Sequence, residues 1–333
     1  VDPTLFSSGL LHIKGIFHLS LTPFDSAGNL DIPALKTSIR MVTQNSVLEG
    51  EDVVFLALGT TGEFYAMSEE ENRQVIDVVT QEVNGRFPVM IGTGRAGTKN
   101  TIEMSKYAQS AGADALLVIP PYYTMPTEEG VIRHFESVAD AVEIGITIYN
   151  NPAASKLWLP MPVIKRLAKV ENIIGLKENT NNPMAFLTML QNIPKEDMAI
   201  FAGLGHFMYQ FMCFCDCRGF VTEMLNYAPH LAVELYHAGL EKDAGKVRAA
   251  ADKMNLFWNW VFRLAAKHSG IPSALHPASQ IPGDMPYYQA ANKMAAQLCG
   301  MPAGIARGPM ENIPEEEIAE LKEILKEMGC NVE

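Results

Sequence analysis

Short continuous apolar runs alternate along the chain with longer segments of helical periodicity. A run such as Val53–Leu58 has the length of a strand, and its lack of polar alternation is typical of a strand buried on both faces. Helix-start signals follow, including Asp31 before Pro33 and a capping box at Ser68 and Glu71. The apolar runs predict strands at 15–23, 53–58, 88–92, 114–119, 144–149, 172–176, 198–202 and 218–222.

Eight strand–helix units predict an α/β fold, a (β/α)8 TIM barrel. An open doubly wound sheet is the alternative, but no glycine-rich dinucleotide fingerprint follows the first strand. We expect an N-terminal arm at 1–12, the barrel at 13–240 and a C-terminal helical region at 241–333. Two helices are predicted to start after Asp31 and after Ser68. Further helices are predicted at 98–111, 127–142, 160–169, 183–192, 206–212, from about 228, at 242–267, 286–298 and 314–328.

Composition narrows the class of protein. The 333 residues carry a formal net charge of −12, so nucleic acid and anionic membrane are poor partners. No apolar run approaches the length of a membrane span, and the N-terminus lacks a basic region leading into one. We expect a cytoplasmic protein, with a processed precursor as the alternative. Cys213, Cys215 and Cys217 admit a zinc site, but an extended segment with buried thiols explains them more simply, so no metal is expected.

Lys177 ends the apolar run that starts at Ile173. The carboxyl ends of barrel strands face the active-site mouth, so this amine is expected there. Apolar neighbours disfavour the charged form of a lysine, and the free amine attacks ketones to form Schiff bases. The alternative is a strand-end lysine that turns out to solvent.

Two further strand ends carry polar groups. Gly59 and Gly62 flank Thr60 and Thr61, and successive N–H groups in such a turn can bind an anion. A tight loop with capping threonines is the alternative. Tyr149 ends the fifth strand, where a phenol can relay protons to a nearby amine, or where it is a core tyrosine with a satisfied hydroxyl. Together with Lys177, this set suits a 2-oxo acid, whose ketone and carboxylate lie on adjacent carbons.

At these motifs the sequence resembles the dihydrodipicolinate synthase and N-acetylneuraminate lyase family. The resemblance covers about residues 14–240 and more loosely the tail. It implies a homotetrameric barrel lyase, a dimer of dimers, with no metal or organic cofactor. It assigns the Schiff base to Lys177, the proton relay to Tyr149 and the carboxylate of the 2-oxo acid to Thr60 and Thr61. Tyr123 matches a tyrosine that reaches a neighbouring subunit's site. The matching motifs are Gly59–Glu63, Pro120–Tyr123, Tyr149–Pro152 and Gly175–Glu178.

Departures from the family pattern bear on the subgroup. Dihydrodipicolinate synthases carry an arginine where this chain has Ala154, which removes a bidentate carboxylate anchor. Neuraminate lyases carry acidic residues just after strand seven, where this chain has Gly203 to His206. The loop from Asn151 is similar in spacing to that of aromatic hydratase-aldolases. The residues left to select the second substrate are Arg95, Asn179, Gly203, His206, Val221, Thr222 and Glu223. His206 is a candidate acid or base, but we expect a histidine at a helix start to lie in solvent.

These residues predict a Schiff-base lyase that cleaves or forms a carbon–carbon bond, with pyruvate and an aldehyde as its small-molecule partners. One alternative keeps the same imine but eliminates water, as a 2-keto-3-deoxy sugar acid dehydratase. Dihydrodipicolinate synthase proper is disfavoured by Ala154. The remote alternative, from another class, is a barrel that binds a 2-oxo acid without turning it over.

Overall fold

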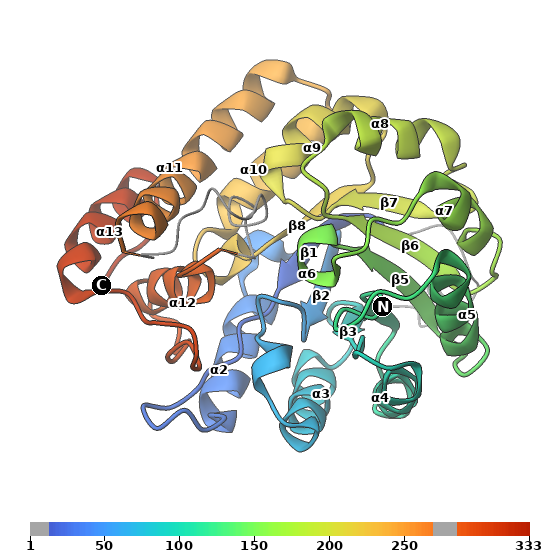
Figure 1. Cartoon of the computed structure of the whole chain (residues 1–333). Helices are drawn as coiled ribbons and strands as arrows, with labels where there is room; N and C mark the ends of the chain where they lie inside the picture. The colour runs from blue at the N-terminus through green and yellow to red at the C-terminus, as the bar shows by residue number, and fades with distance from the viewer. Residues whose placement is uncertain (1–12, 269–284) are drawn as a thin grey trace. The chain divides into compact units, whose positions relative to one another are not determined.

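Eight parallel strands close into a barrel in the order in which they occur along the chain (Figure 1). The computed structural model describes residues 13–268 and 285–333. Strands and helices alternate along the chain, so the predicted (β/α)8 fold is confirmed. The strands are β1 (Gly15–Leu19), β2 (Val53–Ala57), β3 (Val89–Gly92), β4 (Ala115–Val118), β5 (Gly145–Asn150), β6 (Ile173–Glu178), β7 (Ala199–Ala202) and β8 (Gly219–Thr222).

The contacts divide the chain into two compact units. The first unit comprises, within the described chain, residues 13–17, 52–57 and 84–221. It therefore contains six of the eight strands completely and the beginnings of β1 and β8. Its helices are α4 (Thr98–Ser110), α5 (Glu128–Ala139), α6 (Pro152–Ser155), α7 (Met161–Leu167), α8 (Pro183–Asn192) and α9 (His206–Met212), followed by the 3-10 helix η3 (Cys213–Cys215). In Figure 1, α4, α5, α7 and α8 lie around the outside of these strands.

Strand register shows which side chains face the interior of the barrel. Phe17 on β1 stacks on Phe201 on β7, with ring centroids 3.9 Å apart. The strand β8 lies between β1 and β7, so these rings meet across the interior. Lys177 pairs with Phe201 and Tyr149 pairs with Lys177, and paired residues of parallel strands point to the same face. Lys177 and Tyr149 therefore point inward.

A bulge between β5 and β6 sets this pairing. Ile146 pairs with Ile173, whereas Thr147 pairs with Gly175, so Ile174 is the extra residue. If the pairing continued from Ile146 and Ile173 without the bulge, Tyr149 would face Leu176. Gly145 makes room for the bulge, because a Cβ there would lie 2.1 Å from Ile174 Cδ1.

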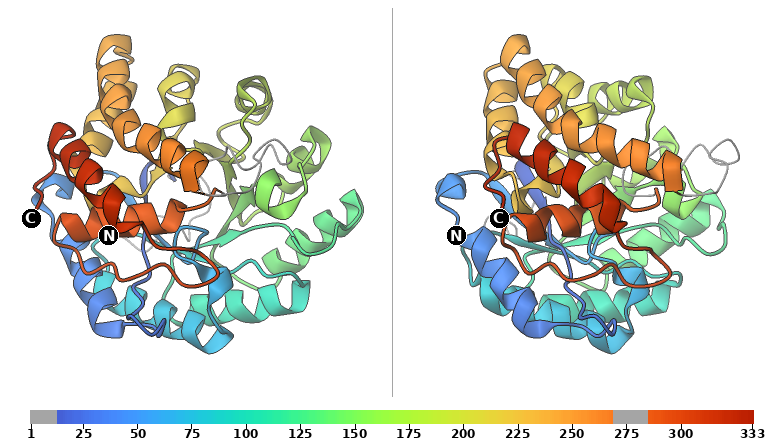
Figure 2. Two further views of the ribbon diagram at one scale, coloured as in Figure 1. Left: turned by 60° about the vertical axis from the view of Figure 1, so that its left-hand side comes forward. Right: turned by 90° about the vertical axis from the view of Figure 1, so that its left-hand side faces the viewer.

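The second unit holds residues 18–51, 58–83 and 222–333, apart from the undescribed segment. Its long helix α11 packs against α10 and α13, and Figure 2 shows α11, α12 and α13 gathered together. Trp258 and Trp260 of α11 are buried. The helices are α2 (Ile32–Thr43), η1 (Ser46–Leu48), η2 (Phe64–Ala66), α3 (Glu69–Val83), η4 (Met224–Asn226), α10 (Pro229–Leu240), α11 (Ala244–His268), α12 (Tyr288–Leu298) and α13 (Glu315–Glu327).

Predicted helix starts are confirmed by their caps. Asp31 Oδ1 accepts a hydrogen bond from Ala34 N at 3.0 Å. The hydroxyl of Ser68 accepts from Glu71 N, and the Glu71 carboxylate accepts from Ser68 N. The first strand was predicted too long, because β1 ends at Leu19. The short helix α6 was not predicted.

The extended segment expected at the three cysteines is wrong. Cys213 and Cys215 lie in η3, and Asp216 follows in the left-handed region at φ 63°. Cys213 and Cys217 are buried, whereas Cys215 is exposed. A helical turn therefore replaces the alternation of an extended strand.

The sequence-based domain limits stay a prediction, and the arm at 1–12 lies outside the described residues. None of the helices that the structure describes is long and apolar enough to cross a membrane.

Barrel closure depends on close contact at Gly219. A Cβ on this residue would lie 2.0 Å from the carbonyl oxygen of Gly15. We expect Gly219→Ala to lower the free energy of unfolding by about 3 kcal/mol or more, because backbone atoms cannot give way cheaply. Denaturant titration measures this loss. The control is Gly97→Ala, where no atom lies within 4 Å of the added Cβ. Equal stabilities of the two variants would contradict the prediction.

Candidate active site

Lys177 is buried inside the barrel, with 3% of its surface exposed. Its Nζ lies 4.0 Å from the centroid of the Tyr149 ring, which is itself 5% exposed. The alternative in which Lys177 turns out to solvent is therefore wrong. Lys177 thus lies between two aromatic residues of the barrel interior, Tyr149 on β5 and Phe201 on β7.

Asn151 orients the hydroxyl of Tyr149. Its Nδ2 donates to Tyr149 Oη at 3.0 Å, while its Oδ1 accepts from Ala154 N at 3.3 Å and so caps α6. Because the phenol oxygen accepts this bond, the hydroxyl proton stays available for donation to another group. Asn151 was not among the predicted site residues. Its position before Pro152, where asparagine is a favoured helix cap, is the signal that marks it.

Glu178 points away from Lys177 although it is the next residue. It pairs with Asn150 on the outer face of the wall, and its carboxylate accepts from Asn150 Nδ2 at 2.8 Å and from Thr180 N at 2.7 Å. Burial raises the pKa of Glu178 to about 7, and these hydrogen bonds oppose the shift. The carboxyl braces the ends of β5 and β6, and it does not face the amine.

Asn179 and Gly203 lie side by side past the ends of β6 and β7. Asn179 N donates to Asn150 O at 2.9 Å, and Gly203 N donates to Glu178 O at 2.8 Å. These two bonds extend the backbone hydrogen bonding between β5 and β6 and between β6 and β7. A Cβ on Gly203 would lie 2.1 Å from Asn179 Oδ1. Glycine is therefore required here for the amide of Asn179 to keep its place.

The remaining predicted residues of the first unit differ in burial. Arg95 is buried, and its Nη1 donates to Gly94 O at 3.0 Å. His206 begins α9 with 3% exposure, so the expectation that it lies in solvent is wrong. Val221 is buried on β8, whereas Tyr123 is 78% exposed.

Thr60 and Thr61 belong to the second unit. Their loop makes two successive turns, with Gly62 N donating to Gly59 O and Glu63 N donating to Thr60 O, each at 3.1 Å. Thr61 is buried, and its hydroxyl lies 2.8 Å from Tyr288 Oη.

Glu223 and Thr222 are also buried residues of the second unit. The structure thus brings Lys177 together with Tyr149, and Asn179 together with Gly203. That the threonines act together with Lys177 stays a prediction.

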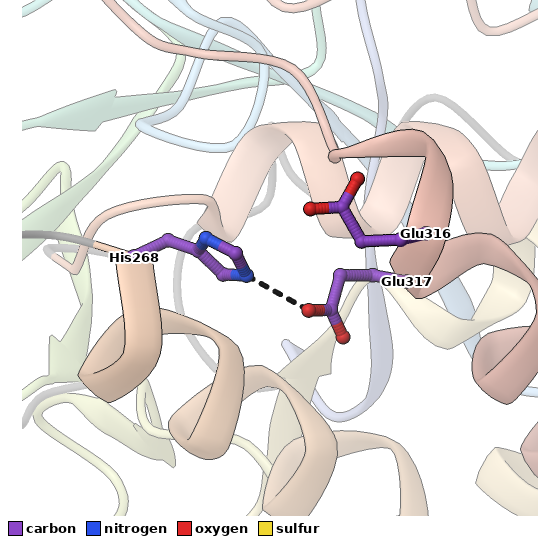
Figure 3. A group of neighbouring side chains, drawn as sticks. All are labelled: His268, Glu316 and Glu317. Carbon is purple, nitrogen blue, oxygen red and sulfur yellow. Dashed lines mark hydrogen bonds and ion pairs between the residues drawn. The ribbon is translucent and has the colours of Figure 1, made fainter.

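His268, Glu316 and Glu317 form the one cluster of potential metal ligands among the residues that the structure describes (Figure 3). His268 Nε2 lies 2.8 Å from Glu317 Oε1. The ammonium of Lys267 pairs with the same oxygen. A cation of the chain therefore already neutralises this carboxylate, and the cluster is an ion-pair link between α11 and α13.

Residues 12–283 match the model of the Dihydrodipicolinate synthetase family. The chain belongs to this family. It is 33% identical over 270 residues to the 4-hydroxy-tetrahydrodipicolinate synthase of Pseudomonas aeruginosa, covering 81% of this chain and 90% of that one. It is 31% identical over 317 residues to the enzyme of the same name from Methanococcoides burtonii, covering 95% and 99%.

A solved structure is similar over nearly the whole chain. YagE, a prophage protein of the dihydrodipicolinic acid synthase family from E. coli K12 in complex with pyruvate, superposes with a TM-score of 0.81 at 27% identity, covering 96% of this chain and 100% of that one. As a member of the dihydrodipicolinate synthetase family, the present chain is a lyase of the Schiff-base pyruvate aldolase type.

The raised pKa of Glu178 has a consequence for stability. The folded carboxyl stays protonated up to about pH 7, whereas the unfolded one ionises near its ordinary value of 4.5. Below pH 4.5 the carboxyl is protonated in both the folded and the unfolded state. Between pH 4.5 and 7 it stays protonated in the folded state but has lost its proton in the unfolded state. Stability should therefore fall as pH rises from about 4.5 to 7, by about 3 kcal/mol at most. Thermal unfolding between pH 4.5 and 8 measures this.

The matched variant is Glu178→Gln, which cannot ionise. Its stability should lack this component of the pH dependence. A wild-type curve that runs parallel to that of the variant over the same range would contradict the assignment.

Proposed function

We propose that this protein is a Schiff-base lyase that acts on a 2-oxo acid, with Lys177 as its nucleophile. The observation that carries the proposal is the buried amine of Lys177 held 4.0 Å from the ring of Tyr149. Burial beside a phenol gives this lysine both shelter from bulk water and a neighbouring proton donor, which Schiff-base formation needs.

The proposed reaction needs one nucleophile and one proton relay. Lys177 Nζ attacks the ketone carbon, and the carbinolamine loses water once Tyr149 donates its proton to the departing hydroxyl. The Tyr149 phenolate takes the proton of the hydroxyl on the carbon that becomes the aldehyde, and the protonated imine accepts the electron pair of the breaking carbon–carbon bond. This releases the aldehyde and leaves an enamine, with Tyr149 protonated again. Protonation of the enamine carbon and addition of water to the imine release pyruvate and regenerate the amine.

The role proposed for Thr60 and Thr61 is to hold the carboxylate. Hydroxyls and backbone N–H groups in a tight turn offer several donors to an anion without a full positive charge. The reaction requires no metal or organic cofactor, because the protonated imine itself serves as the electron sink.

A second candidate function comes from the relatives. Both curated relatives are named 4-hydroxy-tetrahydrodipicolinate synthase, which favours that activity. Ala154 speaks against it, since α6 presents a methyl group where those synthases are expected to carry a guanidinium. The dehydratase alternative forms the same imine with Lys177, but the imine then eliminates water and does not release an aldehyde.

We also propose a homo-oligomer, a dimer of dimers, located in the cytoplasm. Tyr123, at 78% exposure, is available to a neighbouring copy. Light scattering in solution tests the assembly.

Borohydride reduction in the presence of pyruvate tests the central proposal. A pyruvyl adduct should form on Lys177 and be located by peptide mass mapping. Lys177→Arg should form no adduct and lose about a thousandfold or more in turnover. The control is Lys169→Arg, a change at an exposed lysine that pairs with Asp197. An unlabelled wild-type protein, in conditions that label a reference pyruvate lyase, would show that pyruvate forms no imine here.

Product analysis separates the candidate reactions. Cleavage yields pyruvate and an aldehyde in equal amounts from a 2-keto-3-deoxy acid, while dehydration yields a semialdehyde and no pyruvate. We expect cleavage, and we expect 4-hydroxy-tetrahydrodipicolinate synthase activity to be absent. Ala154→Arg is the informative variant for the second point. Synthase activity in the wild-type protein would remove the argument from Ala154.

A further inference from the structure

Helix α12 holds the threonine loop at three places. The hydroxyls of Tyr288 and Thr61 lie 2.8 Å apart, and Gln289 Nε2 donates to Thr60 O at 3.3 Å. Lys293, one helical turn beyond Gln289, pairs with Glu63 at the end of the loop. All these contacts lie within the second unit. A single face of α12 therefore contacts both threonines and the glutamate that ends their motif.

The Lys293–Glu63 pair is completely buried, with 1% and 0% of the side chains exposed. Lys293 Nζ also donates to Ile305 O at 2.6 Å, and Glu63 Oε2 accepts from Arg307 N at 2.8 Å. Burial lowers the pKa of Lys293 to about 8, and Glu63 opposes this shift. Burying two charges costs free energy that a hydrophobic pair would not cost, so the pair specifies a geometry more than it stabilises the fold.

That geometry is unusual at Glu63. Its backbone is left-handed, at φ 57°, a conformation that non-glycine residues rarely adopt without support. Thr22 Oγ1 donates to Gly62 O at 2.8 Å and so fixes the preceding residue. Contacts therefore fix the loop at the carbonyls of Thr60 and Gly62, at the hydroxyl of Thr61 and at the carboxylate of Glu63.

Either hydroxyl of the Tyr288–Thr61 pair can be the donor, and the proposed role of Thr61 selects one direction. The carboxylate of a bound 2-oxo acid only accepts hydrogen bonds, so in this role the Thr61 hydroxyl donates its one proton to the ligand. Tyr288 must then be the donor to Thr61 Oγ1. In that arrangement the phenol aims the threonine proton toward the ligand.

We propose that α12 positions the carboxylate-binding loop, with Tyr288, Gln289 and Lys293 as positioning residues for the 2-oxo acid. The inference rests on the proposed role of Thr60 and Thr61. It assigns a part in substrate binding to a helix of the C-terminal region, which showed no chemistry of its own in the sequence.

Tyr288→Phe is the first test, because it removes one hydroxyl and keeps the ring that stacks near Trp258. We expect KM for the 2-oxo acid to rise about tenfold with kcat changed less than about threefold, since one oriented hydrogen bond to the bound carboxylate is weakened. Unchanged KM would overturn the role of Tyr288. A loss of kcat at unchanged KM would do the same, because it would place the phenol in the chemical steps.

Lys293→Met is the second test, read by hydrogen exchange of the Gly62 and Glu63 amides. Both should exchange at least about tenfold faster in the variant. The matched control is Leu321→Ala in α13, a buried residue outside these contacts, which should destabilise the protein without selectively speeding exchange in the loop. Loop exchange that is unchanged by Lys293→Met, or that rises equally in the control, would overturn the inference.

The exchange test does not depend on turnover, so it separates the two proposals. If wild-type protein forms no imine with pyruvate but the loop loosens in Lys293→Met, the function fails and the loop support stands. If imine trapping succeeds while both KM and loop exchange stay unchanged in the variants, the function stands and the positioning role fails.

Discussion

The register between β5 and β6 is the constraint on which the chemistry depends. One extra residue, Ile174, shifts the pairing so that Tyr149 faces Lys177 and not Leu176. Because side chains alternate along a strand, this shift also decides that Lys177 points into the barrel while Glu178 points out. An amine and a carboxyl adjacent in sequence are thereby kept on opposite faces. The amine meets aromatic rings, and the carboxyl meets hydrogen-bond donors.

Each unit contains a buried carboxyl whose hydrogen-bond or ion-pair partners have a defined geometry. In the first unit Glu178 receives two donors on the outer face of the barrel wall. In the second unit Glu63 receives Lys293 and the backbone of Arg307. In each case the polar group lies directly after a motif residue, Lys177 or Gly62. Rigid support next to a reactive or binding residue lowers the cost of holding a ligand in one orientation.

Much of the fold was readable from the sequence because strands buried on both faces leave uninterrupted apolar runs. Helices 183–192 and 206–212 were predicted to the residue. The cysteine segment was not, since alternate cysteines fit a strand and a 3-10 turn equally well, and only tertiary packing separates them. The burial of His206 was also predicted wrongly, because a helix start gives no information on burial. Lys177 and Tyr149 were identified as strand ends, but their contact depends on a bulge that no local pattern announces.

Our proposal for the second substrate rests on the short helix α6, which the sequence pattern did not reveal. Its cap, Asn151, binds both the helix backbone and the hydroxyl of Tyr149, so α6 and the proton relay are one structural element. Ala154 is the residue whose backbone N–H takes this cap. The hydrogen bonds of Asn151 run to the backbone of Ala154 and to Tyr149 Oη, so neither depends on the side chain at position 154. The proposed catalytic pair of Lys177 and Tyr149 therefore fits our proposal of an aldehyde without a second carboxylate, which rests on Ala154.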